Sequence, residues 1–309
     1  MVGTLHTSGE SGLQLSSLQW LLDHHRTKEP HRRQMVTDLH LQAGERILDL
    51  GCGPGLWASM FAEKVGPTGE VIGLDFTPEL IGHAVSRLAD DPLRDVIHFV
   101  LGNFWKIPFR DRCFDTVFLG NCCSYVADVV SLIRDMKRVT RVGGRVISKE
   151  FDDGALIFHP VDPHLTAKVF EAATRVLAEA NRPGNHDADS LPAGRDPFAA
   201  AEASVPQFDS FMGRKMHGFF LRGGFEEVWI TTYAIQKVPP LDPAAKRYMQ
   251  GNAEWLAATA APYLSKEDLR QWQAAFDPGA DEYILDREDF YFCMIEMITV
   301  GTVGVPADS

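Results

Sequence analysis

The sequence is poor in the features that mark several classes of protein. Its five cysteines are an odd number and none has C-x-x-C spacing, so we expect reduced thiols and no disulfide framework. Basic residues are outnumbered, with 30 Lys and Arg against 42 Asp and Glu and a net charge of −12. Without a basic stripe to neutralise phosphates, we expect no nucleic-acid partner and no attraction to an anionic membrane.

Long apolar runs and targeting signals are also lacking. The longest apolar-looking stretch, residues 291–305, is interrupted by Glu296 and is too short to span a bilayer. The start of the chain, MVGTLHTSGE, has neither the basic nor the apolar region of a signal peptide. We therefore expect a soluble, cytoplasmic protein with no membrane span.

Two catalytic signatures are absent. No G-x-S-x-G nucleophile elbow occurs, so a Ser-His-Asp hydrolase is not expected. The adjacent Cys122 and Cys123 raise the hypothesis of a metal or metalloid site, but no further ligands follow at regular spacing. We predict no metal site and interpret the two thiols as small buried side chains.

The stretch around which the chain is organised is ERILDLGCGPG, residues 45–55. Its apolar residues Ile47, Leu48 and Leu50 are typical of a buried parallel strand. After the glycines the chain continues as LWASMFAEKV, which has helical spacing. This pattern predicts a ligand lying against bare backbone at a helix N-terminus. The G-x-G-x-G spacing differs from the G-x-G-x-x-G of dinucleotide sites, so NAD is not expected.

Strand and helix patterns alternate at short spacing over residues 45–152. This alternation predicts an α/β fold with a doubly wound, mostly parallel, Rossmann-like sheet and right-handed crossovers. Further strands are predicted at 71–74, 95–100, 112–119, 145–152, 226–235 and 288–301, which gives seven strands in all, and a helix is predicted at 130–144.

The remainder of the chain is predicted to be largely helical and to form a cap. Pro30 falls inside a helical pattern near the N-terminus and is expected to separate two helices. The predicted division is an N-terminal helical lid (1–41), a ligand-binding core (42–152), a cap insertion (153–212), a return to the core (213–239), a helical cap insertion (240–287) and a final strand and tail (288–309).

Polar residues follow the predicted strands at the edge where ligands of such sheets bind. Asp75 can accept hydrogen bonds from two vicinal ribose hydroxyls, and Phe76 could pack against a base. Asn103 offers an amide to a base edge, and Asn121 lies where a polar tail would end. The pattern predicts a nucleoside-like ligand.

These residues carry a resemblance to a known family. The motifs ILDLGCGPG, GLD, GNFWKIPF, FDTVFLGNCCSYVAD and RVTRVGGRV resemble, in order and spacing, those of class I S-adenosylmethionine-dependent methyltransferases. Within that family, the motifs most resemble those of the ubiquinone/menaquinone-biosynthesis-like branch, which acts on small molecules. The resemblance is specific over residues 45–152 and weaker beyond. It implies S-adenosyl-L-methionine as cofactor and an antiparallel seventh strand between the fifth and the sixth.

The resemblance also implies roles for individual residues. Asp49, Gly51 and Gly53 would surround the methionine moiety, and Asp75 would hold the ribose. The adenine would be edged by Asn103, where the family more often has Asp and where an amide carbonyl can still accept from the adenine amino group. The predicted cofactor-binding residues are Asp49, Gly51, Cys52, Gly53, Asp75, Phe76, Asn103, Phe104 and Asn121.

Methyl transfer from a sulfonium is an in-line displacement, for which the protein mainly aligns donor and acceptor. An oxygen, nitrogen or carbon acceptor can also need a base. The predicted candidates are Asp152 at the end of the fifth strand, Tyr125 after the fourth and His24 on the N-terminal helix. A turn cap is the alternative role for Asp152, and simple exposure the alternative for His24. Glu150 is a further candidate at the same strand end.

Aromatic residues in the predicted cap suggest a bulky, apolar, natural-product or quinone-like acceptor; alternatively they form a small core of their own. They are Phe151, Phe158, Phe208, Phe211, Phe219, Phe220, Trp255, Tyr263, Trp272 and Phe276. Two other functions fit the same fold: a cyclase or decarboxylase that binds S-adenosylmethionine without transferring its methyl group, and a non-catalytic partner subunit. A small-molecule acceptor is the expected partner, and a homo-oligomer is left open.

Overall fold

The computed structural model describes residues 17–180 and 209–304, and the chain divides into two compact units. The unit that we call the core unit comprises Lys28–Asp153, Phe211–Tyr233 and Ile295–Ser309. The other, called the helical unit, comprises Met1–Thr27, Gly154–Ser210 and Ala234–Met294. All the cofactor-binding residues predicted from the sequence belong to the core unit.

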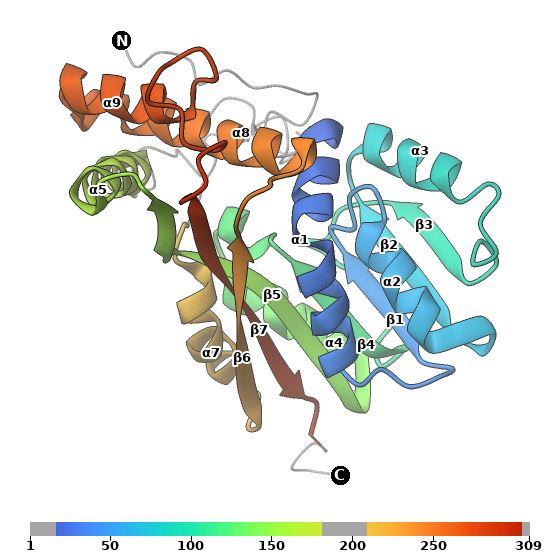
Figure 1. The fold of residues 1–309 in the computed structure, drawn as a ribbon. Helices are drawn as coiled ribbons and strands as arrows, with labels where there is room; N and C mark the ends of the chain where they lie inside the picture. Colours follow the sequence, from blue (N-terminus) through green and yellow to red (C-terminus); the bar gives the residue numbers. More distant parts are fainter. Residues whose placement is uncertain (1–16, 181–208, 305–309) are drawn as a thin grey trace. The chain divides into compact units, whose positions relative to one another are not determined.

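The described residues include one seven-stranded sheet (Figure 1). Its strands are β1 (Arg46–Leu50), β2 (Glu70–Asp75), β3 (Ile97–Leu101), β4 (Phe114–Gly120), β5 (Thr140–His159), β6 (Val228–Lys237) and β7 (Tyr291–Thr302). Their order is β3-β2-β1-β4-β5-β7-β6, and β1 to β5 pair in parallel. β7 runs opposite to its neighbours, as drawn in Figure 1. The predicted doubly wound sheet, with an antiparallel seventh strand between the fifth and sixth, is confirmed.

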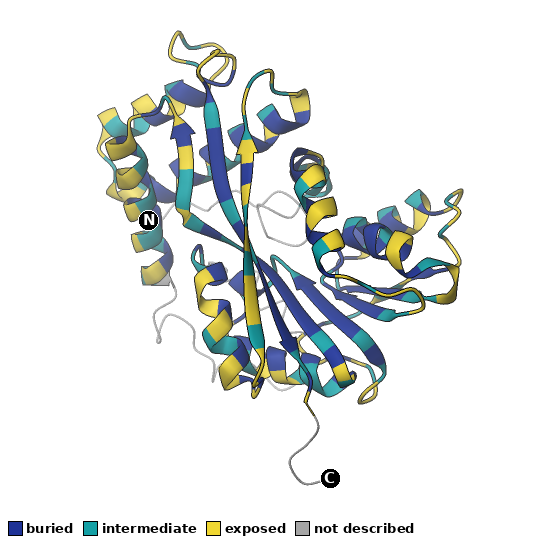
Figure 2. Ribbon diagram, turned by 60° about the horizontal axis from the view of Figure 1, so that its bottom comes forward, coloured by how far each residue is buried: buried dark blue, intermediate teal, exposed yellow. Residues whose placement is uncertain are grey.

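Helices cover both faces of the sheet in the core unit. They are α2 (Leu56–Val65), α3 (Pro78–Arg87), α4 (Val129–Val139) and α7 (Met212–Arg222), with short 3₁₀ turns at Gly66–Thr68 and Cys123–Tyr125. Leu48 and Leu50 of β1 lie in the core cluster with Met136 of α4 and Phe220 of α7. α2 packs on the opposite face of the sheet, where its Phe61 contacts β4. Because both faces of the sheet are covered at β1, this strand has a largely apolar sequence. β6, at the end of the strand order, is largely exposed (Figure 2).

The helical unit contains α5 (Pro163–Ala180), α8 (Pro243–Ala260), a 3₁₀ turn at Ala261–Tyr263 and α9 (Lys266–Phe276). Its centre is an aromatic cluster in which Phe158 lies 5.9 Å from Trp272, 5.1 Å from Phe276 and 5.1 Å from Phe292, measured between ring centroids. The Trp272 indole N–H donates to the Ala253 carbonyl at 2.9 Å. These aromatics pack on one another, so at these positions the structure favours the small-core interpretation over a ligand-lining role.

The prediction that Pro30 separates two helices was wrong. A single helix, α1 (Leu18–Asp38), runs through this position. A proline in a helix interior removes a hydrogen bond and costs about 3 kcal/mol. Both flanks of the proline are buried, with Thr27 and Lys28 on one side and Met35 and Val36 on the other. We infer that packing of these flanks outweighs the local cost.

Replacing Pro30 by alanine should therefore raise stability. The restored N–H can donate to the Arg26 carbonyl, which recovers up to about 3 kcal/mol, less about 0.4–1 kcal/mol because the unfolded chain becomes more flexible. Urea unfolding of the variant should show a higher midpoint. Pro243→Ala is the matched control, because Pro243 lies in the first turn of α8, where no helical hydrogen bond is missing. A lower midpoint for Pro30→Ala would contradict the argument.

Among the described residues, no helix combines the length and the apolar character needed to cross a membrane.

Candidate active site

The glycine turn after β1 brings bare backbone close to its surroundings. Gly51 has a φ of 63°, and a Cβ at this position would lie 2.5 Å from the Cys122 sulfur. Gly55, with a φ of 71°, has equally little room, because a Cβ there would overlap the Phe99 ring. α2 begins at the next residue, so its free N–H groups face this turn. The turn thus has the close backbone approach and the helix N-terminus that the sequence predicts.

Asp75, at the end of β2, is fastened to this turn. One carboxylate oxygen accepts from the Gly53 N–H at 2.8 Å, and the other accepts from the Thr77 N–H at 2.8 Å. Burial raises the pKa of Asp75, while these backbone hydrogen bonds lower it. The Thr77 side chain and the Phe76 backbone also donate to this carboxylate. An ionised carboxylate has about four acceptor sites, so the hydroxyl donors of a ligand would share them with these groups.

Asp49, in β1, has a buried carboxyl group that can accept a further hydrogen bond. Its Oδ2 has no hydrogen-bond partner among the described residues. Burial raises the pKa of Asp49 well above its usual value, and the negative charge of Asp75 adds to this shift. A buried oxygen without a partner costs about 1–3 kcal/mol, so the site is incomplete without a hydrogen-bond donor from a ligand or water.

The segment after β3 forms an aromatic wall. Phe104 is buried and stacks on Trp105 with ring centroids 4.5 Å apart, and Phe76 lies 6.2 Å from the same tryptophan. The amide oxygen of Asn103 accepts from the backbone N–H of Trp105 at 2.7 Å. One lone pair of that oxygen remains for the predicted pairing with an adenine amino group. The sequence analysis overlooked Trp105, although the neighbouring aromatics in GNFWKIPF signalled it.

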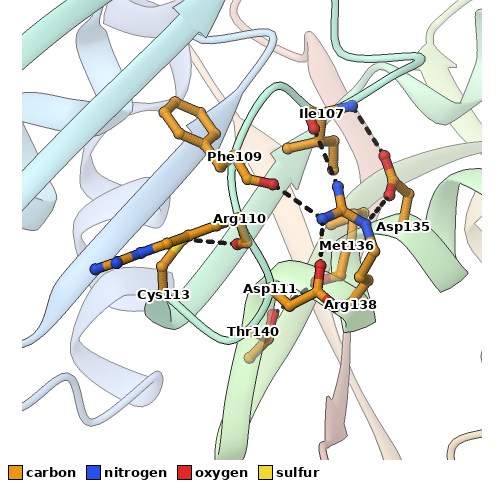
Figure 3. A network of polar contacts seen from close by, with 9 residues as sticks. All are labelled: Ile107, Phe109, Arg110, Asp111, Cys113, Asp135, Met136, Arg138 and Thr140. Carbon is orange, nitrogen blue, oxygen red and sulfur yellow. Dashed lines mark hydrogen bonds and ion pairs between the residues drawn. The ribbon is translucent and has the colours of Figure 1, made fainter.

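One guanidinium fastens the loop that follows this wall to α4 (Figure 3). Arg138 donates to the Ile107 carbonyl at 3.0 Å and the Phe109 carbonyl at 2.9 Å, and it pairs with Asp111 at 2.7 Å. Asp135 completes the network by accepting from Arg138 at 2.6 Å and from the Ile107 N–H at 2.8 Å. The loop after β3, which is predicted to lie beside the adenine, is therefore held to α4 at its C-terminal end.

Asn121 follows β4 in a left-handed conformation, with a φ of 58°. Its N–H donates to the Lys149 carbonyl at 2.7 Å, and its side-chain oxygen accepts from the Lys149 ammonium at 2.9 Å. Lys149 and Lys28 both contact Oε1 of Glu296, at 2.6 and 2.7 Å. Both lysines and Glu296 are buried, and the sequence analysis gave none of these three a role.

Glu150 lies in the middle of β5 and has a buried carboxyl group; the prediction that this strand ends at Asp152 was wrong, because β5 continues to His159. Its Oε1 accepts from the Cys123 N–H at 3.0 Å, whereas Oε2 has no partner among the described residues. Burial raises the pKa of Glu150, and the Cys123 hydrogen bond and the Lys149 charge lower it. Burial also raises the pKa of the neighbouring Tyr125, so its phenol keeps its proton and is a poor base. Tyr125 can instead donate a hydrogen bond.

Asp152, the predicted base, is tied to another side chain. Its two oxygens accept from Arg214 of α7 at 2.5 and 2.6 Å, as a bidentate pair. Asp152 is fully buried, and α7 also approaches the strand at Gly213, where a Cβ would lie 3.0 Å from the Phe151 carbonyl oxygen. This pair gives Asp152 a structural role in the packing of α7 on β5.

His24, the third predicted catalytic residue, belongs to the helical unit rather than to the core unit. There it is buried and stacks on Tyr248, with ring centroids 5.2 Å apart, and lies 4.7 Å from Trp20. The expectation of an exposed histidine was therefore wrong. The neighbouring Asp23 forms a bidentate pair with Arg247, which ties α1 to α8 within this unit.

The five cysteines are free thiols. Cys52, Cys122 and Cys123 lie around the glycine turn, and burial raises the pKa of each well above its usual value. Protonated, buried thiols act as small packing side chains rather than as nucleophiles. Among the described residues, no group of three or more potential ligands could hold a metal ion.

Comparison with known proteins bears on this arrangement. Residues 41–191 match the family described as "Methyltransferase domain". This part of the chain is therefore similar to a methyltransferase domain. The glycine turn, Asp75 and the aromatic wall all fall inside the matched residues, so the predicted resemblance is confirmed for this part of the chain.

Curated relatives of the methyltransferase domain include two demethylmenaquinone methyltransferases. That of Oceanobacillus iheyensis is 35% identical over 126 residues, which are 41% of this chain and 52% of the relative. That of Symbiobacterium thermophilum is 35% identical over 122 residues, 40% of this chain and 49% of the relative. The chain thus spans about half the length of the curated relatives it matches.

A solved structure supports the fold beyond the methyltransferase domain. The YcgJ protein of Bacillus subtilis is similar with a TM-score of 0.53 at 17% sequence identity. The similarity covers 89% of this chain and 99% of that protein. At this identity it bears on the fold alone.

Proposed function

We propose that the protein is an S-adenosylmethionine-dependent methyltransferase that transfers a methyl group to an oxygen, nitrogen or carbon atom of a small metabolite. The observation that carries the proposal is the glycine turn with Asp75 hydrogen-bonded to its backbone. Gly51 has no room for a side chain, and the Gly53 N–H holds the Asp75 carboxylate against the turn. The residues present therefore fit the cofactor.

When bound, the cofactor supplies the electrophilic methyl group, and the chain supplies position and proton transfer. Asp75 would hold the ribose, and the wall formed by Phe76, Phe104 and Trp105 would contact the base. Glu150 would take the proton of the acceptor at its Oε2, which has no partner among the described residues. Alignment of this kind contributes about 7–11 kcal/mol to catalysis, and a positioned base about 10²–10⁴-fold.

For the acceptor we propose a bulky, quinone-like or natural-product aromatic compound. The support comes from the relatives, whose names specify demethylmenaquinone, over the part of the chain that they share. The aromatics of the helical unit do not add to it, because Phe158, Trp272 and Phe276 are accounted for by their own cluster. Phe208 lies outside the described residues.

Calorimetric titration with S-adenosylhomocysteine tests the cofactor assignment. The wild type should bind, and Asp75→Asn should bind about tenfold more weakly, because hydrogen bonds to the charged carboxylate are replaced by weaker ones. Glu79→Gln, in the first turn of α3, is a control for a nearby loss of charge. Wild-type protein that does not bind S-adenosylhomocysteine would refute the proposed function.

Product mass tests the transfer itself. The protein is incubated with S-adenosylmethionine and a reduced 2-prenyl-1,4-naphthoquinone, and then with a panel of phenols and indoles. A product heavier by one methylene supports transfer. A product of unchanged mass would point instead to a cyclase, and a loss of carbon dioxide to a decarboxylase.

A further inference from the structure

The core unit contains a buried ionic network that the proposed reaction does not yet use. Lys28 of α1, Lys149 of β5 and Glu296 of β7 are each at most 1% exposed. The two ammonium groups meet the same carboxylate oxygen, at 2.7 and 2.6 Å. Buried ion pairs contribute little net stability, because desolvation offsets their attraction. A role in positioning is therefore worth testing.

The network ends on Asn121. An ammonium group can donate hydrogen bonds but cannot accept them, so the Asn121 atom at 2.9 Å from Lys149 must be the amide oxygen. The amide nitrogen is then turned away from Lys149, and it has no hydrogen-bond partner among the described residues. The left-handed backbone and the 2.7 Å bond from the Asn121 N–H to the Lys149 carbonyl hold the residue in place.

The strand order shows which part of a ligand this amide would meet. Asn103, Asp75, Gly51 and Asn121 follow β3, β2, β1 and β4, which are consecutive in the sheet. Three strand spacings amount to roughly 14 Å. A ligand with its base at β3 and its ribose at β2 therefore brings its amino-acid tail to β4.

We propose that Lys149 is a positioning residue for the cofactor, which orients the amide nitrogen of Asn121 toward the α-carboxylate of S-adenosylmethionine. This inference rests on the proposed function. The charges around Asn121 are mixed: Lys149 contacts Glu296, and Glu150, Asp75 and Asp49 act on the adjacent Cys122. The proposal therefore rests on the direction of the Asn121 amide and on the strand order.

The test compares two ligands that differ in the tail alone. S-adenosylhomocysteine carries the amino-acid tail, whereas 5′-methylthioadenosine keeps the adenosine and the thioether and lacks the tail. In calorimetric titrations, Lys149→Met should bind S-adenosylhomocysteine about tenfold more weakly, the size of one hydrogen bond to a charged group. Its affinity for 5′-methylthioadenosine should stay within about twofold of the wild type, since no contact to the tail is involved.

Two further variants separate positioning from a structural role. Lys28→Met removes the other lysine from the same Glu296 oxygen without touching Asn121, so its affinity for both ligands should be unchanged. Asn121→Gly removes the amide and tolerates the left-handed backbone. In that background Lys149→Met should cause no further loss, because it acts through the amide that is already gone.

Three results would overturn the inference: equal weakening of both ligands, equal effects of Lys28→Met and Lys149→Met, or full additivity with Asn121→Gly. If Lys149→Met does not fold, the triple variant Lys28→Met, Lys149→Met, Glu296→Gln removes all three buried charges and must show the same selective loss. Wild-type protein that fails to bind either ligand refutes the proposed function, and with it the inference. Wild-type binding that no variant alters selectively refutes the inference alone.

Discussion

Glu150→Gln should lower the turnover of the proposed methyl transfer by about 10²–10⁴-fold, the usual contribution of a positioned base. The substitution preserves shape, and the glutamine oxygen can still accept from the Cys123 N–H. The position of Oε2 becomes an amide nitrogen, which donates and cannot take a proton. The measurement is the initial rate with the reduced 2-prenyl-1,4-naphthoquinone, together with the affinity for S-adenosylhomocysteine, which should not change.

Stability distinguishes this role from a structural one. Removing a buried carboxylate with one oxygen lacking a partner should leave the thermal midpoint unchanged or raise it. Asp152→Asn, at the next position on the same face of β5, is the matched control. It breaks the bidentate pair with Arg214 and should lower the midpoint while turnover of the folded protein persists. Full turnover in Glu150→Gln would exclude the base assignment.

The pH dependence follows from the same site. As a base, Glu150 must be ionised, and burial raises its pKa, so the rate should fall as the pH is lowered through that raised value. Cys122, Cys123 and Tyr125 face the same region, and burial raises the pKa of each, so they stay protonated there. Lys149, with its pKa lowered by burial, would lose its charge on the alkaline side. The expected profile is a bell whose acid limb is absent in Glu150→Gln.

Gly51→Ala should destabilise the protein by about 2–5 kcal/mol and weaken S-adenosylhomocysteine binding by about a hundredfold. The methyl group would be forced into a left-handed conformation, which costs about 1–2 kcal/mol. It would also lie 2.5 Å from the Cys122 sulfur, and such overpacking costs about 1–3 kcal/mol more. Urea unfolding and calorimetry measure the two effects.

Two variants separate strain from overlap. Gly143 has a φ of 75° and nothing within 4 Å of a Cβ, so Gly143→Ala should cost the strain alone. Adding Cys122→Ala to Gly51→Ala removes the overlapping sulfur, and the nearest remaining atom is then 3.6 Å away, in the Phe104 ring. The double variant should recover the overlap part of the loss. Equal destabilisation by Gly51→Ala and Gly143→Ala would contradict the crowded turn.

The sequence predicted those parts of the site whose conformation depends on residues nearby in the chain. Gly51 and Asp75 follow buried strands directly, and hydrophobic periodicity locates those strands. Asn121 was found for the same reason. Where packing decided the outcome, the local pattern misled: Pro30 was read as a helix break, and α1 continues through it.

Residues whose partners are distant in the chain could not be predicted in this way. Lys28 and Glu296 are 268 positions apart, and Arg214 lies 62 positions from Asp152. The single sequence shows each charge but not its partner. Glu150 and Asp152 illustrate the consequence, because both lie on the same face of β5 and only Asp152 is paired with Arg214 of α7.

The Arg138 network bears on how the proposed nucleoside site would select its ligand. The guanidinium links the loop after β3 to α4 through two carbonyls and two carboxylates, so the ordering of that loop takes place during folding. Binding then has little conformational entropy left to lose in this loop. A loop that is ordered before binding has little freedom to make space for a larger base, so adenosine analogues with bulky ring substituents should bind more weakly than adenosine itself.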